Sequence, residues 1–232
     1  MQNVNNNTTD DSNDIGALET EIRNAVAQGS CIQDAVQHLT LKAMNANSLD
    51  FESLRRIITA VIQGAHEGAH QQLQHATNQS QTAKTQITEA ITGLDAALAK
   101  FAAASMLAVE EATGRAQKFS DNELSRTSAD LESLENLFLE TLHHTARTTK
   151  GFIADTLHDL VRHAQNNGTA VGEQIKETLL AFTQQMASVG HTQLDAGVHL
   201  THATADLIHK TATGILMGIN NQTKSEDKPQ DH

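Results

Sequence analysis

The chain has 232 residues, a formal net charge of −12, 38% hydrophobic residues and only 3% aromatic ones. The negative charge argues against a protein that binds nucleic acid through phosphates, since that requires clustered Lys and Arg, and against a purely electrostatic attraction to anionic membranes. With one proline and no Trp or Tyr, few large side chains are present for a broad globular core. Ala, Leu, Gln, Glu and Lys favour helix and strand signals are almost absent, so we predict an all-α fold.

Cysteine content and the terminal segments bear on location. Cys31 is the only cysteine, so no intrachain disulfide can form, which fits a reducing cytoplasm. Residues 1–14 lack the apolar core of a secretory signal, and the most apolar run, 101–109, is too short to cross a membrane. We therefore expect a cytoplasmic protein without a transmembrane segment. The polar residues 1–13 and 220–232 are expected to be disordered tails.

Two short helices are predicted near the beginning of the chain, at about 14–28 and 30–45. In the first, apolar residues recur at helical spacing, Asp14 is a suitable cap, and Gly29 ends the helix. Ser30 and Gln33 have the spacing of a capping box for the second.

The longest periodic stretch predicts a helix over about 49–119. Between Leu54 and Phe119, eighteen steps of three or four residues cover 119 − 54 = 65 residues, a mean of about 3.6. The weakest point is Thr77–Thr82, where the stripe carries only Ser80. This segment is either a polar section of one helix or a hairpin. Continuity is favoured, because the apolar phase is kept and neither Gly nor Pro lies inside it.

Two further long helices are predicted at about 121–165 and 169–219. Ser120 and Glu123 have capping-box spacing at the start of the first, and Asn166-Asn-Gly168 ends it. A mean repeat near 3.6 argues against a sustained heptad coiled coil, whose repeat is about 3.5. We therefore predict an elongated antiparallel bundle of long amphipathic helices, preceded by the two short ones, as a single domain over 14–219.

Large apolar residues at helical spacing in the long helices form a stripe that serves either for packing or for binding a surface. We refer to the following residues as the apolar stripe: Leu54, Ile58, Val61, Ile87, Ile91, Leu94, Leu98, Phe101, Leu131, Leu134, Phe138, Leu142, Phe182 and Met186.

His66-Glu-Gly-Ala-His70 matches the H-E-x-x-H pattern of zinc metalloproteases. Residues i and i+4 share a helix face, so both imidazoles can hold one zinc ion while Glu67 activates water. A third ligand would have to come from His75 or Glu89, and no strand is visible to align a substrate. The alternatives are a zinc hydrolase, incidental metal binding by His66 and His70, and a solvated polar face. We favour the last, and expect no enzymatic activity, no metal site and no cofactor.

The other histidines are scattered, and they serve either in pH sensing or as part of a polar face. Glycines also recur in pairs four residues apart, a spacing that allows helices to approach closely. In helices this polar, we interpret the pairs as sites of close packing in a bundle, or as chance. The pairs are Gly64/Gly68, Gly168/Gly172 and Gly214/Gly218.

Two stretches are poor in charge. Between residues 60 and 88 only Glu67 and Lys84 are charged, and between 178 and 209 only Asp195 and Asp206 are. Solvated helices usually carry many ion pairs at i,i+4. A weakly charged amphipathic helix either packs on several sides inside a bundle or lies on a hydrophobic surface, where apolar burial provides the attraction.

Several segments resemble an uncharacterised family of bacterial proteins of about this length, over residues 15–219. The resemblance implies no activity and no catalytic residues. It is carried by Leu39-Thr-Leu-Lys-Ala43, Gly93-Leu-Asp-Ala-Ala-Leu-Ala99, Lys118-Phe-Ser-Asp-Asn-Glu-Leu124, Leu134-Glu-Asn-Leu-Phe-Leu-Glu-Thr141 and Gly168-Thr-Ala-Val-Gly172. In its Ala-, Gln- and Thr-rich amphipathic helices, the chain is also similar in style to phasins, the helical proteins that coat polyhydroxyalkanoate granules.

The leading hypothesis for function is a non-enzymatic, phasin-like protein that associates with a hydrophobic surface, either a storage granule or a lipid monolayer. It would be cytoplasmic and peripheral on that surface. The alternative is an oligomeric scaffold or adaptor in which stripes pair between copies of the chain. The zinc hydrolase is the third hypothesis.

Overall fold

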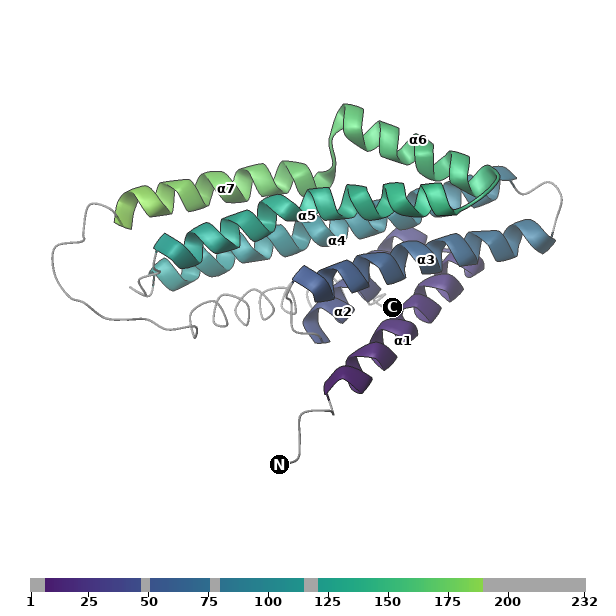
Figure 1. Ribbon diagram of the computed structural model, residues 1–232, viewed down its shortest axis with the longest axis horizontal. Coiled ribbons are helices and arrows are strands. Elements are labelled where there is room, and N and C mark those ends of the chain that lie inside the picture. The colour runs from purple at the N-terminus through teal and green to yellow at the C-terminus, as the bar shows by residue number, and fades with distance from the viewer. Residues whose placement is uncertain (1–6, 47–50, 76–79, 115–120, 190–232) are drawn as a thin grey trace, which may run out of the picture. The chain divides into compact units, whose positions relative to one another are not determined.

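The computed structural model describes residues 7–46, 51–75, 80–114 and 121–189, and these form seven α-helices without a strand (Figure 1). The predicted all-α class is confirmed for this part of the chain, while the elongated bundle stays a prediction. The helices are α1 Asn7–Gln28, α2 Ile32–Ala46, α3 Phe51–His75, α4 Ser80–Gly114, α5 Asp121–Thr148, α6 Phe152–Asn167 and α7 Ala170–Val189.

The prediction of a single helix over 49–119 is wrong. The chain forms α3 and α4 instead, and these run in opposite directions (Figure 1). Within the predicted polar stretch Thr77–Thr82, the stripe carries only Ser80, so no apolar contact favours a straight helix there. A reversal instead allows the apolar residues on both sides of this stretch to be buried within one molecule.

The helix predicted over 121–165 is also divided, into α5 and α6. Gly151, between them, has φ 73° and ψ −155°, a backbone conformation that is essentially restricted to glycine. The predicted end at Asn166-Asn-Gly168 is confirmed. Gly168 follows α6 with φ 83°, and its N–H donates a hydrogen bond to the carbonyl of Ala164 at 2.8 Å.

The boundaries of the expected disordered tail and of the last helix also differ from the prediction. Residues 7–13, expected in the tail, belong to α1. Helix α1 ends before Gly29 as predicted, with φ 74° at this glycine. The predicted helix 169–219 is described as α7 up to Val189, and residues 190–219 lie outside the described residues.

The described residues fall into two compact units, where the sequence predicts a single domain over 14–219. Unit 1 comprises the residues up to Leu98 and Leu134–Ala170. Unit 2 comprises Ala99–Ser133 and the residues from Val171 onward. Helices α4 and α5 contribute residues to both units.

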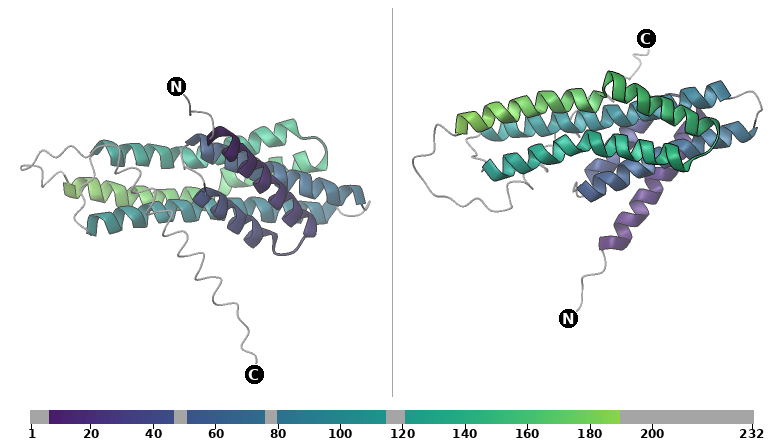
Figure 2. Two further views of the ribbon diagram at one scale, coloured as in Figure 1. Left: turned by 90° about the horizontal axis from the view of Figure 1, so that it is seen from below. Right: turned by 45° about the horizontal axis from the view of Figure 1, so that its top comes forward.

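In unit 1, glycines bring helices into close contact. A Cβ atom added at Gly64 would lie 2.5 Å from the carbonyl oxygen of Glu19, and one at Gly68 would lie 2.6 Å from that of Arg23, so α3 meets the backbone of α1 closely. Gly93 brings α4 equally close to α2, with its added Cβ 2.4 Å from the carbonyl oxygen of Gln33. Figure 2 shows α1 and α2 lying against the helices that follow them.

The predicted close packing is therefore confirmed for the pair Gly64/Gly68. Gly168/Gly172 does not share a helix, because Gly168 follows α6 while Gly172 lies in α7. Gly214/Gly218 lies outside the described residues.

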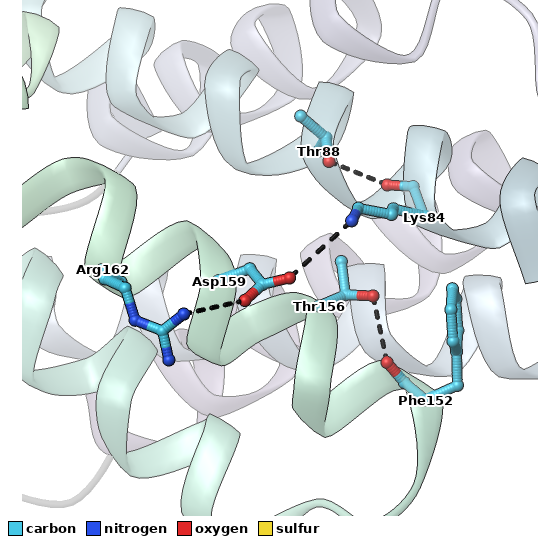
Figure 3. Close-up of polar contacts among 6 residues, drawn as sticks. All are labelled: Lys84, Thr88, Phe152, Thr156, Asp159 and Arg162. Atoms are coloured by element: carbon cyan, nitrogen blue, oxygen red, sulfur yellow. Dashed lines mark hydrogen bonds and ion pairs between the residues drawn. The ribbon is translucent and has the colours of Figure 1, made fainter.

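Helix α6 is joined to α4 in unit 1 by a polar contact that uses Lys84 (Figure 3). Lys84 Nζ lies 3.7 Å from Asp159 Oδ2, and Arg162 approaches the other oxygen of the same carboxylate at 3.5 Å. Both partners of the Lys84–Asp159 pair are about half exposed, so the pair contributes at most about 1 kcal/mol to stability.

Unit 2 packs the end of α4 against the beginning of α7. The buried side chains include those of Phe101, Leu131 and Ile175. Thr178 is fully buried, and its hydroxyl lies within hydrogen-bonding distance of two carbonyls, Gln174 at 2.9 Å and Ala102 at 3.3 Å.

Candidate functional site

The apolar stripe lies in the core of the described structure. Each member whose side chain the structure describes is buried, from 0% exposed at Ile58 to 7% at Leu54 and Phe101. The side chains of Phe182 and Met186 lie outside the described part. In this conformation the described members of the stripe therefore pack between helices, and they can reach an external surface only if helices separate.

Helix α4 is nevertheless suited to an apolar environment. Among the described helices, its segment Ser80–Leu107 is long and apolar enough to cross a membrane by length and composition. Of the residues in its most apolar 18-residue stretch, 56% are buried. Core helices of soluble proteins pass the same test, so the expected absence of a transmembrane segment stays a prediction. Three large apolar side chains are exposed in the described residues: Leu107 (39%), Phe152 (37%) and Leu180 (64%).

Five buried hydroxyls bond within their own helices. Each of the five donates to the carbonyl four residues earlier, so an acceptor is supplied without a second helix. The pairs are Thr40 with Val36, Ser105 with Phe101, Thr145 with Thr141, Thr156 with Phe152 and Thr178 with Gln174, at 2.7–3.0 Å. The described helices therefore carry these polar groups without depending on a neighbouring helix for their hydrogen bonds.

A polar groove of about 1080 Å³ runs between α3 and α5 within unit 1. It combines histidines, threonines and glutamines with a few charged side chains. Its lining residues are Arg55, Thr59, Gln63, His66, Glu67, His70 and Gln71 from α3, Leu137, Glu140, Thr141, His144, Thr145 and Thr148 from α5, and Thr149 and Lys150 after α5.

The two histidines of the H-E-x-x-H motif both line this groove. They lie one helical turn apart, and their ring centroids are 6.2 Å apart with the planes tilted by 44°. Burial lowers the pKa of His66 below its ordinary value. The neighbouring His70 lowers this pKa further, while Glu67 opposes the shift. At neutral pH the His66 ring is therefore uncharged.

The rest of a zinc-hydrolase site is not assembled in the described structure. The carboxylate of Glu67 accepts a hydrogen bond from Arg23 Nη1 at 3.1 Å, so this residue pairs with α1. No group of three or more His, Cys, Asp or Glu side chains among the described residues is arranged to hold a metal ion. Of the predicted third ligands, Glu89 belongs to α4, and the side chain of His75 is not described.

The α5 wall of the groove was not predicted from the sequence. Glu140 and His144 are four residues apart and therefore share a face of α5. The same spacing relates Thr141 to Thr145. This periodicity could have identified the face, but the separation of α3 from α4, and hence the place of α5 opposite α3, was needed to show what it borders.

Comparisons with known proteins assign the chain to a family without adding a known structure or activity. The search of curated proteins and the search of solved structures each gave no match. The profile of a family of unknown function, DUF6781, matches residues 8–225, which is most of the chain. The chain therefore belongs to this uncharacterised family, as the resemblance of its segments indicated.

Proposed function

We propose that this protein is a non-enzymatic, phasin-like helical protein that associates with a hydrophobic surface, either a storage granule or a lipid monolayer. The observation that carries the proposal is the character of α4. Its segment Ser80–Leu107 is long and apolar enough to cross a membrane, and 56% of the residues in its most apolar stretch are buried. The unburied residues near the end of this segment include Ala103, Met106 and Leu107, whose apolar surface would leave water on contact with an apolar phase, at roughly 25 cal/mol per Å². The polar side chains of Thr92, Asp95 and Lys100 would remain in water.

Because the described members of the apolar stripe are buried, association through the stripe would require the helices to separate. Contacts with the surface would replace the helix-to-helix contacts of residues such as Leu94 and Leu98, which are fully buried. The buried hydroxyls of Thr40, Ser105 and Thr156 would keep their bonds, because their acceptors lie in the same helix. Ion pairs between helices, such as Lys84–Asp159, join exposed side chains and oppose separation only weakly.

Exposed apolar side chains in unit 2 would make the first contact with the surface. Leu107 on α4 and Leu180 on α7 are both exposed. Their replacement by aspartate removes apolar contact without opening a cavity in the core. Thr92→Asp is the control for the introduction of aspartate, because Thr92 is also exposed on α4 and the change adds one negative charge, against two in the double variant, without removing a large apolar side chain.

Flotation with phosphatidylcholine-coated triacylglycerol droplets and with polyhydroxyalkanoate granules tests the proposal. Wild-type protein and Thr92→Asp should float, whereas the double variant Leu107→Asp/Leu180→Asp should float markedly less, with all three equally helical by circular dichroism. A wild-type protein that stays in the aqueous fraction, with helicity unchanged by droplets, contradicts the proposal. Light scattering after gel filtration addresses the scaffold alternative. A stable oligomer that does not float and is dissociated by the double variant would favour it.

A further inference from the structure

The proposed association with a hydrophobic surface does not involve the two histidines, His66 and His70, that line the groove. His66 and His70 project from successive turns of α3 into the same groove, with ring centroids 6.2 Å apart. We infer that this pair binds one divalent transition-metal ion through both imidazoles, with water or a small molecule in the remaining coordination positions. The groove, at about 1080 Å³, has room for those additional ligands.

The helix places both rings where one ion can meet them. His66 and His70 are four residues apart on α3 (Phe51–His75), so they share one face of this helix, and both line the groove. A histidine binds a metal through an unprotonated ring nitrogen, so metal and protons compete for the same site.

The ligand types decide which ions fit. Imidazole suits Zn²⁺, Ni²⁺ and Cu²⁺, whereas Mg²⁺ and Ca²⁺ prefer oxygen ligands. Two imidazoles at i and i+4 share one helix face and can hold one zinc ion, with bonds of about 2.0–2.1 Å from the metal to each nitrogen. Glu67 is already paired with Arg23, so we infer binding and not hydrolysis.

The chain offers a matched control for incidental binding by its 13 histidines. His143 and His158 also have ring centroids 6.2 Å apart, with the planes at 71°, but they lie on α5 and α6. Neither residue lines the groove. This second pair matches the first in ring separation and differs in its arrangement on the helices and in its surroundings.

Isothermal titration of the full-length chain, purified without a histidine tag, with ZnCl₂ and NiCl₂ tests the inference. We expect one equivalent to bind more tightly than any others. His66→Gln and His70→Gln should each weaken this binding at least about tenfold, since loss of even an outer-sphere partner of a metal site commonly lowers affinity 10- to 100-fold. The double variant His143→Gln/His158→Gln should bind as the wild type does.

Two further measurements keep the test decisive. Circular dichroism establishes that each variant is folded. Copper bound to the wild type should show nitrogen hyperfine coupling from two imidazoles in its electron paramagnetic resonance spectrum, and from one in His66→Gln. Absence of a distinct equivalent, unchanged affinity in both single variants, or an equal loss in the control pair would overturn the inference, the last identifying incidental binding by scattered histidines.

Discussion

Gly64→Ala should destabilise the protein, although alanine is the better helix former. The added Cβ would lie 2.5 Å from the carbonyl oxygen of Glu19, whereas ordinary contact begins at 3.4 Å. The two atoms would therefore have to move apart by about 3.4 − 2.5 = 0.9 Å. The neighbouring atom is backbone, and it cannot rotate away as a flexible side chain could. Overpacking of this kind typically costs about 1–3 kcal/mol. The helix-propensity gain returns only about 0.5–1 kcal/mol.

The control is the same substitution in open space. Gly16 lies in α1, and nothing lies within 4 Å of a Cβ added there. Gly16→Ala should therefore show the propensity term alone and stabilise the protein by about 0.5–1 kcal/mol. Since both changes replace a helical glycine by alanine, the sign of the difference isolates the contact between α3 and α1.

Thermal unfolding followed by far-ultraviolet circular dichroism measures both effects. For a chain of this size, 1 kcal/mol corresponds to roughly 2–4 °C in Tm. The two terms leave a net loss of up to about 2.5 kcal/mol at Gly64, which predicts a Tm lower by up to roughly 10 °C, whereas Gly16→Ala predicts an increase of roughly 1–4 °C. If Gly64→Ala raised the Tm as much as Gly16→Ala does, the reasoning from close backbone approach would be refuted.

Three other changes probe the core, the turn and the histidine pair. Phe138→Ala should lower the free energy of unfolding by about 3–5 kcal/mol in a urea titration, because the ring is 1% exposed and a cavity would replace it; a loss below about 1 kcal/mol would contradict a core position. Gly151→Ala should lower the free energy of unfolding by roughly 1–3 kcal/mol, because its φ of 73° and ψ of −155° suit only glycine. No atom lies within 4 Å of the added Cβ, so the loss would report backbone strain alone, and an unchanged Tm would contradict it. In metal-free buffer, stability should fall as the pH drops from 6.5 toward the lowered pKa of folded His66, because the unfolded chain takes up a proton that the folded chain resists. His66→Gln should flatten this part of the pH curve, whereas an unchanged slope would assign it to another group.

Helical periodicity predicted the fold class and the buried positions well, but not the places where the chain turns. The helical spacing of apolar residues continues through Thr77–Thr82 and across Gly151. Because this spacing indicates only which face of a helix is apolar, it predicts one helix where the structure has α3 and α4, and one where it has α5 and α6. A reversal keeps that pattern while changing which helices touch. The local signals at Gly29 and Gly168 were stronger, because a glycine directly after an apolar periodic segment is a common helix end.

The candidate sites were predictable only in part, because they depend on contacts distant in sequence. The spacing of His66 and His70 placed both on one helix face, which follows from local geometry alone. The pairing of Glu67 with Arg23, 44 residues earlier, and the border of the groove formed by α5 depend on tertiary packing. The sequence also could not decide whether the apolar stripe is exposed, since the same amphipathic pattern serves a core and a surface.

The close crossing of α1 and α3 has a consequence for the order of folding. Its contacts join residues such as Arg23 and Glu67, which are 44 positions apart, and its helices end by His75. Both helices of the crossing therefore lie in the first third of the chain, and short loops close faster than long ones. We expect α1 and α3 to associate while the remainder is still being synthesised. Pulsed hydrogen exchange during refolding should show their amides protected before those of α6 and α7, and simultaneous protection would contradict this order.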